Sequence, residues 1–155
     1  MKSRSQDSRL RRLVTAFEDP MTELYLLFYK SCLSVFSTAN VVLQSESPCI
    51  HLLWDSLMRL IQTIMGRFVR AEQLEECDDC CSVDFVNFQK PDDSLMIGYA
   101  TSAKLCGVYD DVSAVQETKF YSGVRAFFSI ACRYLIDRLP KDPCVVSARF
   151  VNFES

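Results

Sequence analysis

Three cysteines crowd into one short acidic stretch, EECDDCCS at residues 75–82. Cys77, Cys80 and Cys81 lie within five positions of one another, and carboxylates flank them on both sides. Thiolates and carboxylates are among the ligands of zinc, so a metal site is one interpretation. The CxxC spacing of Cys77 and Cys80 is also that of a redox pair. A solvated loop that carries thiols without using them is the third interpretation.

The spacing of the cysteines favours the solvated loop. Structural zinc takes four nitrogen or sulfur ligands, usually as two pairs. Here one CxxC pair and Cys81 are followed only by the distant Cys106, so the candidate metal ligands are Cys77, Cys80, Cys81 and Cys106. No later histidine completes a second pair, and we expect no cofactor. Neighbouring acids raise the pKa of a thiol and suppress its thiolate, which disfavours redox chemistry.

Other catalytic arrangements are absent from the sequence. His51 is the single histidine and falls on the polar face of its predicted helix, one turn before Asp55. A nucleophile beside it would have to be Cys49 or a distant thiol, and neither lies in a nucleophile motif. Glycine-rich phosphate-binding loops are missing as well. We therefore predict a protein that is not an enzyme and has no small-molecule substrate.

Apolar stripes at helical spacing indicate the elements that must position these residues. A capping residue followed by proline, a pattern typical of helix starts, recurs at Asp19-Pro20, Ser47-Pro48 and Asp142-Pro143. The predicted helices cover residues 8–19, 20–45, 48–70, a stretch capped by Asp92 or Asp93 and ending near Gly107, 112–139, and a short piece after Pro143. VDFVNF, at residues 83–88, alternates like a short extended piece.

These elements predict an all-α fold, an irregular helical bundle of about five or six helices with a long acidic loop. The length of 155 residues suits a single domain. Its expected parts are a basic N-terminal helix or arm at 1–19, a helical hairpin at 20–70, the acidic cysteine-containing loop at 71–93 and C-terminal helices at 94–153.

The apolar residues predict both the core and a surface. The helix at 112–139 should bury Phe120, Val124, Phe127, Phe128, Ala131, Tyr134, Leu135 and Leu139. The helix at 20–45 is apolar nearly all round, so some of Leu26, Leu27, Tyr29, Leu33 and Val41 should stay exposed. Because exposed apolar patches commonly mark interfaces, we expect self-association or a protein partner.

Charge and hydropathy indicate whether the chain binds DNA or a membrane. The net charge is −3, with eight acids against Lys90 alone in residues 72–93. DNA affinity should therefore be weak at most and should come from the basic arm, through Lys2, Arg4, Arg9, Arg11 and Arg12. Residues 24–43 are long enough for a membrane anchor, but a central lysine such as Lys30 costs about 2.5–3.5 kcal/mol on insertion. A buried helix is favoured, so no membrane is expected.

The cellular location follows from the N-terminus and the cysteines. The start of the chain, MKSRSQDSRLRRL, lacks the apolar core of a secretory signal. Several of the eight cysteines fall on apolar helical faces, where a reduced thiol behaves as a small hydrophobe. We therefore expect a reduced, intracellular protein of the nucleus or cytoplasm.

Three blocks of the sequence resemble hAT-type transposases and genes derived from them. They are DPMTELYLLFYKSCLSVFSTANVVLQSESPCIHLLWDSLMRLIQTIMGRFV, PDDSLMIGYATSAKL and KFYSGVRAFFSIACRYLIDRLPKDPCVVSARFVNF. They occur in the family's order and cover roughly residues 18–153. The resemblance implies part of the helical insertion inside the family's RNase H-like catalytic domain.

The resemblance carries no catalytic residue onto this chain. The family's metal-binding aspartates and CxxH element precede the similar stretch, and its final glutamate and dimerisation region follow it. The acidic block at 72–84 departs from the family pattern. We therefore predict a non-enzymatic, transposase-derived helical fragment that is at most a protein interaction module. The alternatives are a DNA-associated piece of a metal-dependent transposase or nuclease, and a protein anchored in a membrane by residues 24–43.

Overall fold

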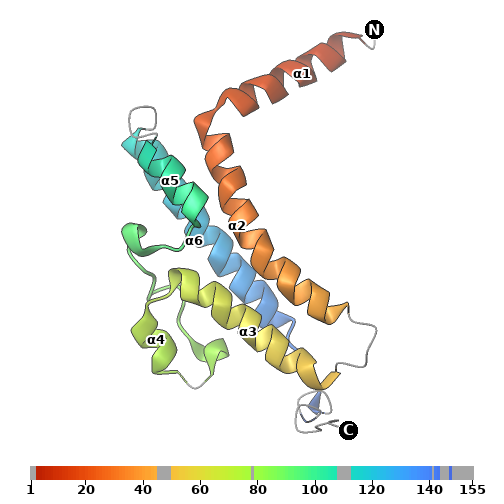
Figure 1. Ribbon diagram of the computed structural model, residues 1–155, viewed down its shortest axis with the longest axis vertical. Coiled ribbons are helices and arrows are strands. Elements are labelled where there is room, and N and C mark those ends of the chain that lie inside the picture. Colours follow the sequence, from red (N-terminus) through yellow and green to blue (C-terminus); the bar gives the residue numbers. More distant parts are fainter. Residues whose placement is uncertain are drawn as a thin grey trace. The chain divides into compact units, whose positions relative to one another are not determined.

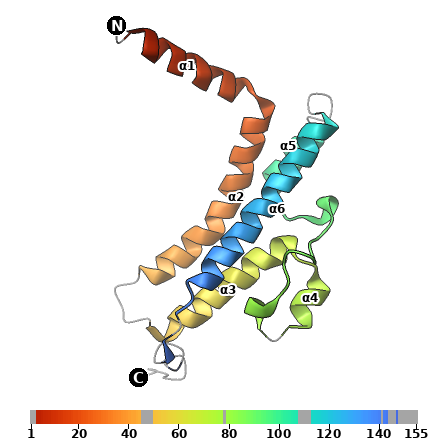
Figure 2. The same cartoon turned by 180° about the vertical axis from the view of Figure 1, so that it is seen from behind.

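The fold is all-α in the part that the structure describes, as the sequence predicts. The computed structural model describes residues 3–44, 50–77, 79–107, 113–140, 142–143 and 147. Its helices are α1 (Ser3–Glu18), α2 (Pro20–Leu43), α3 (Ile50–Phe68), α4 (Ala71–Glu75), α5 (Tyr99–Gly107) and α6 (Ala114–Asp137), as Figures 1 and 2 show. Two short 3-10 turns, η1 (Cys80–Ser82) and η2 (Asp92–Ser94), lie between α4 and α5.

One of the predicted helix starts can be followed in atomic detail. Pro20 is the first residue of α2, and the Asp19 carboxylate accepts a hydrogen bond of 2.9 Å from the amide of Met21. This confirms the capping role predicted for Asp19. The predicted start at Ser47-Pro48 lies outside the described residues. Of the last predicted helix only Pro143 and Ser147 are described, and both have helical backbone.

The described residues form two compact units. The first unit comprises Met1–Cys32 and Ile97–Ser122. Its core is centred on Phe120 of α6, whose ring centroid lies 5.2 Å from that of Tyr25 and 6.1 Å from that of Phe28. At the surface, Lys104 of α5 forms an ion pair of 2.6 Å with Glu23 of α2.

The second unit comprises Leu33–Met96 and Gly123–Ser155. Phe68, at the end of α3, is completely buried in its core. The Phe68 ring stacks on that of Phe128 of α6, with 5.4 Å between the ring centroids. It also meets the ring of Phe85, which belongs to the acidic segment at residues 72–93, with 6.2 Å between the centroids. Residues of α2 and α3 line a common groove of about 450 Å³. In Figures 1 and 2 these two helices run in opposite directions within this unit.

The buried face of α6 matches the prediction at Phe120, Val124 and Phe128 and departs from it elsewhere. Phe120, Val124, Phe128 and Cys132, at steps of four residues, are buried almost completely. Phe127, Ala131 and Leu135 are half-buried, and Tyr134 is 54% exposed beneath the Arg138 guanidinium. The prediction was wrong for Tyr134 because two apolar stripes adjoin on this helix. Cys132 continues the buried stripe of Phe120, Val124 and Phe128, whereas Tyr134 belongs to the neighbouring stripe.

The helix predicted from Asp92 onward begins later than expected. Asp92–Ser94 forms only a 3-10 turn, after which Leu95 and Ile97 are buried and Met96 is exposed. This alternation is that of an extended segment. Gly98 then has φ +97°, a left-handed conformation that a regular helix cannot include, and α5 starts after it.

The prediction of an extended piece at residues 83–88 is also wrong. The Asp84 carboxylate accepts hydrogen bonds from the amides of Val86 and Asn87 at 3.2 and 3.1 Å, which folds the chain into a turn. Within the described ranges, β-pairing is limited to one isolated antiparallel bridge between Val69 and Gln89.

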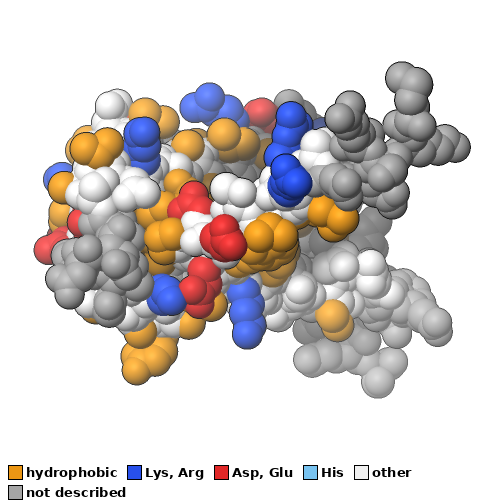
Figure 3. Space-filling model, turned by 90° about the horizontal axis from the view of Figure 1, so that it is seen from above, with side chains coloured by type: hydrophobic (Ala, Val, Ile, Leu, Met, Phe, Trp, Pro, Cys, Tyr) orange, Lys and Arg blue, Asp and Glu red, His pale blue; other side chains and the backbone are white. Residues whose placement is uncertain are grey.

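Apolar side chains are exposed on both α1 and α2. On α2 the structure confirms exposure for Leu26, Tyr29, Leu33 and Val41, whereas Leu27 is half-buried. On α1 every described side chain, from residue 8 to 18, is exposed. Figure 3 shows one face of the molecule, on which hydrophobic side chains reach the surface beside acidic and basic ones.

Two glycines should respond to alanine in opposite ways. A Cβ at Gly98 would lie 2.5 Å from Ser31 Cβ, and its positive φ disfavours any side chain. We expect Gly98→Ala to lower the free energy of unfolding by about 1–3 kcal/mol. Gly66 lies inside α3, and apart from its chain neighbours and the backbone of its own helix nothing lies within 4 Å of an added Cβ, so Gly66→Ala should raise the free energy of unfolding by about 0.5–1 kcal/mol. Urea unfolding followed by circular dichroism measures both, and equal shifts would contradict the assignment of Gly98.

Candidate functional site

A connected group of polar contacts among the described residues of the second unit surrounds the C-terminus of α3. The last carbonyl groups of a helix lack partners within it and need donors from elsewhere. Here Met65 O accepts from the Val69 amide (2.8 Å), Gly66 O from Lys90 Nζ (2.6 Å), Arg67 O from the Met96 amide (2.9 Å) and Phe68 O from the Lys90 amide (2.7 Å). The segment from 88 to 96 thus caps α3. The charged Lys90 ammonium also suits the negative end of the helix dipole.

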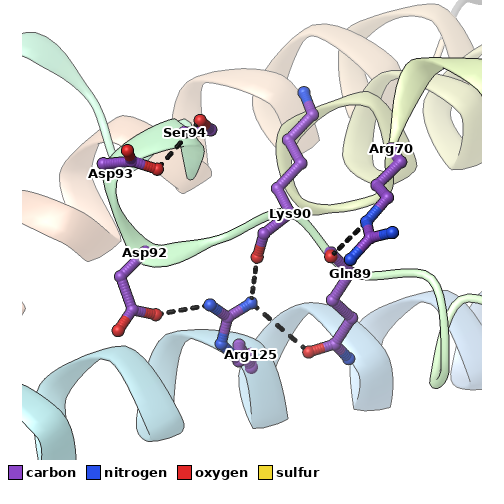
Figure 4. A network of polar contacts seen from close by, with 7 residues as sticks. All are labelled: Arg70, Gln89, Lys90, Asp92, Asp93, Ser94 and Arg125. Atoms are coloured by element: carbon purple, nitrogen blue, oxygen red, sulfur yellow. Dashed lines mark hydrogen bonds and ion pairs between the residues drawn. The ribbon is translucent and has the colours of Figure 1, made fainter.

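Arg125 of α6 holds this capping segment from the other side, as Figure 4 shows. Its guanidinium donates to the Lys90 carbonyl at 2.7 Å and to Gln89 Oε1 at 3.5 Å, and it forms an ion pair with the Asp92 carboxylate. On the same segment, Arg70 Nε donates to the Gln89 carbonyl at 3.1 Å. The planar guanidinium can serve several acceptors at once, which an ammonium cannot do in this geometry.

Part of this network lines a shallow surface depression of about 700 Å³. Arg70, Lys90 and Arg125 contribute to its lining, together with Glu72 and Asn87. All three cations already donate to carbonyl groups of the protein. Chemically the arrangement is therefore a structural clamp rather than a vacant anion site.

The thiols predicted as candidate ligands are brought together only in part. A carboxylate oxygen of Asp79 and the sulfurs of Cys80 and Cys81 all lie within 4.8 Å of one another. Asp79 positions this turn by accepting a hydrogen bond of 2.9 Å from the Cys81 amide, at the start of η1. Cys77 is half-buried and is not part of this group, and Cys106 is exposed on α5 in the first unit. The sequence did not single out Asp79 as the third ligand because several acids surround the thiols.

Burial, more than neighbouring charge, sets the protonation of these thiols. It raises the pKa of Cys80, and it raises the pKa of Cys81 to about 12, with the hydrogen bond to Asp79 as the next cause. Cys132 of α6 also has its pKa raised to about 12, by burial and then by the charge of Cys80. A raised pKa keeps the Cys80 and Cys81 thiols protonated and weakly nucleophilic at neutral pH, which argues against redox chemistry at these two residues.

The acidic segment is solvated on one side only. Its carboxylates are exposed at all seven described positions, Glu72, Glu75, Glu76, Asp79, Asp84, Asp92 and Asp93. Its apolar residues point the other way, since Cys80, Val83 and Phe85 are buried. The prediction of a solvated loop at residues 75–82 was wrong for Cys80, which is buried. The apolar surface of these three residues is covered because the segment packs against α3.

The prediction for His51 stays untested. The side chain of His51 and all of Cys49 lie outside the described part, so a surface histidine stays a prediction. Across the described helices, α2 included, none combines the length and apolar content that crossing a bilayer requires.

Comparison with known proteins adds no relative. No protein-family model, curated protein or solved structure matches this chain. The resemblance to hAT-type transposases therefore remains a prediction.

Replacing Arg125 should loosen the clamp. Arg125→Met keeps the aliphatic stem but leaves the Lys90 carbonyl, Gln89 and Asp92 without their donor. We expect the free energy of unfolding to fall by about 1–3 kcal/mol. Arg133→Met is the matched control, because Arg133 is exposed on the same helix and its loss should change stability by less than about 0.5 kcal/mol. Chemical denaturation measures both, and equal effects would contradict the clamp.

Proposed function

We propose that this protein is a non-enzymatic helical module that acts through protein contacts, in the first place through self-association. One observation carries the proposal, the unpartnered apolar stripe of α1. Leu10, Leu13, Val14 and Phe17 are 57%, 55%, 55% and 70% exposed. At 100° per residue these four side chains share one face of the helix. A stripe of this kind is ordinarily covered by another apolar surface.

The charges beside the stripe favour an acidic partner surface. Arg9 and Arg11 flank the stripe on the helical wheel, and both are exposed. The acidic segment at 72–93 offers the complementary surface, with seven exposed carboxylates. Val86, Phe88 and Met96, in or next to this segment, are 53%, 37% and 56% exposed. A second copy of the chain therefore supplies both the negative charge and the apolar contacts that α1 needs.

Origin and location form a further part of the proposal. The resemblance of residues 18–153 to the helical insertion of hAT-type transposases supports descent from a transposon. Among the described cysteines, Cys77, Cys80, Cys81, Cys106 and Cys132 carry free thiols. Free thiols support an intracellular location, in the nucleus or the cytoplasm.

DNA association is the second candidate function, and the exposed arginines of α1 are the observation that favours it. Arg9, Arg11 and Arg12 are all exposed on one helix. Phosphate contacts of this kind give an affinity that falls steeply with salt. The same arginines serve the protein contact proposed above, so a binding experiment must separate the two.

Sedimentation velocity over a range of protein concentrations tests self-association. We expect the mean mass to rise with concentration, and the rise to weaken between about 50 and 500 mM salt because charge attraction is screened. Leu13→Glu combined with Phe17→Glu should abolish it by placing charge in the stripe. Folding should be unaffected, since both side chains are exposed.

Val115→Glu is the matched control for this experiment. Val115 is 64% exposed near the start of α6 and lies outside the α1 stripe, so its replacement should leave association unchanged. A chain that is monomeric at every concentration, or one whose association ignores the α1 substitutions, contradicts the proposal. Tight DNA binding at physiological salt that is lost when Arg9, Arg11 and Arg12 become glutamine would favour the second candidate.

A further inference from the structure

Three potential metal ligands converge on one turn of the second unit. The Asp79 carboxylate and the sulfurs of Cys80 and Cys81 approach within 4.8 Å of one another. Consecutive cysteines rarely direct both sulfurs to one point in regular structure, because neighbouring side chains diverge along a helix or strand. Here the tight turn of η1, which Asp79 caps through the Cys81 amide, brings all three groups together.

The spread of these atoms is close to that of a metal-binding site. Zinc binds sulfur at about 2.3 Å and carboxylate oxygen at about 2.0–2.2 Å, so ligand atoms of a tetrahedral site lie roughly 3.5–3.8 Å apart. Starting from separations within 4.8 Å, closure requires a contraction of about 1.3 Å or less. Rotation of the exposed Asp79 and the half-buried Cys81 can supply this movement. Cys80, which is 5% exposed, is the fixed member of the group.

The surroundings favour a cation over other ligands. Glu75, Glu76 and Asp84 are exposed within the same segment, and all repel anions. Residues 72–93 contain one basic residue, Lys90. Its ammonium donates a hydrogen bond to the Gly66 carbonyl. A negative field of this kind raises the local concentration of divalent cations. Two sulfurs in the group select a thiophilic ion over calcium or magnesium, which take oxygen ligands.

We propose that Asp79, Cys80 and Cys81 bind one thiophilic divalent cation of the zinc type, with water in the fourth coordination position. The two sulfurs bind as thiolates, so each bound ion displaces two thiol protons into solution. The Asp79 carboxylate supplies the third ligand atom through one of its oxygens. The ion then replaces the hydrogen bonds within the group and fixes η1 against α3.

Proton release gives this site a recognisable pH dependence. A cysteine thiol is mostly protonated near neutral pH and must lose its proton to bind a metal as a thiolate. If two protons leave, the apparent affinity should rise by about 100-fold for each pH unit near neutrality. Binding through carboxylates alone would be nearly independent of pH in that range, since those groups are already ionised.

Cobalt(II) titration of the reduced protein tests the proposal, because cobalt replaces zinc and absorbs light when bound to thiolate. We expect one ion per chain, a sulfur-to-metal charge-transfer band, displacement by zinc, and the pH dependence given above. Cys81→Ser and Asp79→Asn should each weaken binding by at least tenfold, and Cys81→Ser should also reduce the charge-transfer band. Circular dichroism verifies that both variants stay folded.

Cys106→Ser is the matched control, since Cys106 is an exposed thiol outside this group and should leave the titration unchanged. The proposal is overturned if no charge-transfer band appears, if folded Cys81→Ser binds cobalt as the natural protein does, or if the affinity does not change with pH. Loss of binding in Cys106→Ser would also overturn it, because the ligands would then include a thiol of the first unit.

Discussion

The carbonyl groups at the end of α3 are the constraint on which the second unit depends. Phe68 is completely buried, so the carbonyls around it cannot all rely on water. The backbone of Lys90 and Met96 and the Lys90 ammonium supply the donors. This requirement brings a segment more than twenty residues away in sequence against the helix. Arg125 then fixes that segment to α6.

The same attachment separates the apolar from the charged side chains of the acidic segment. Because both ends of the segment are held at α3, the residues between them have one side that faces the helix and one side that faces water. Phe85 meets Phe68 on the side that faces the helix, where Val83 and Cys80 are also buried. The described carboxylates of residues 72–93 are all exposed to water. A charged outer surface available to a partner and a sheltered group of thiols are therefore two consequences of one packing arrangement.

Local rules predicted the parts of this structure that depend on neighbouring residues. Asp19-Pro20 identified the start of α2, and the apolar stripes identified α1, α2, α3, α6 and the all-α class, whereas the short helix α4 falls in the segment predicted as a loop. Where two stripes adjoin, as for Phe127 and Phe128 of α6, pattern alone could not tell which one the core would cover. Gly98 delayed the start of α5 through a backbone conformation that depends on its close approach to Ser31. The site was least predictable, because Lys90 lies 24 residues from Gly66 and Arg125 lies 35 from Lys90.

Native-state hydrogen exchange at the amides of Lys90 and Met96 tests most directly whether this segment caps α3. Both amides donate to the last carbonyls of α3. They should therefore open only with the helix itself, with an opening free energy equal to that of amides inside α3 such as Met65. Exchange at the rate of an unstructured peptide, while α3 stays protected, would show that the segment is not a cap and would contradict the account.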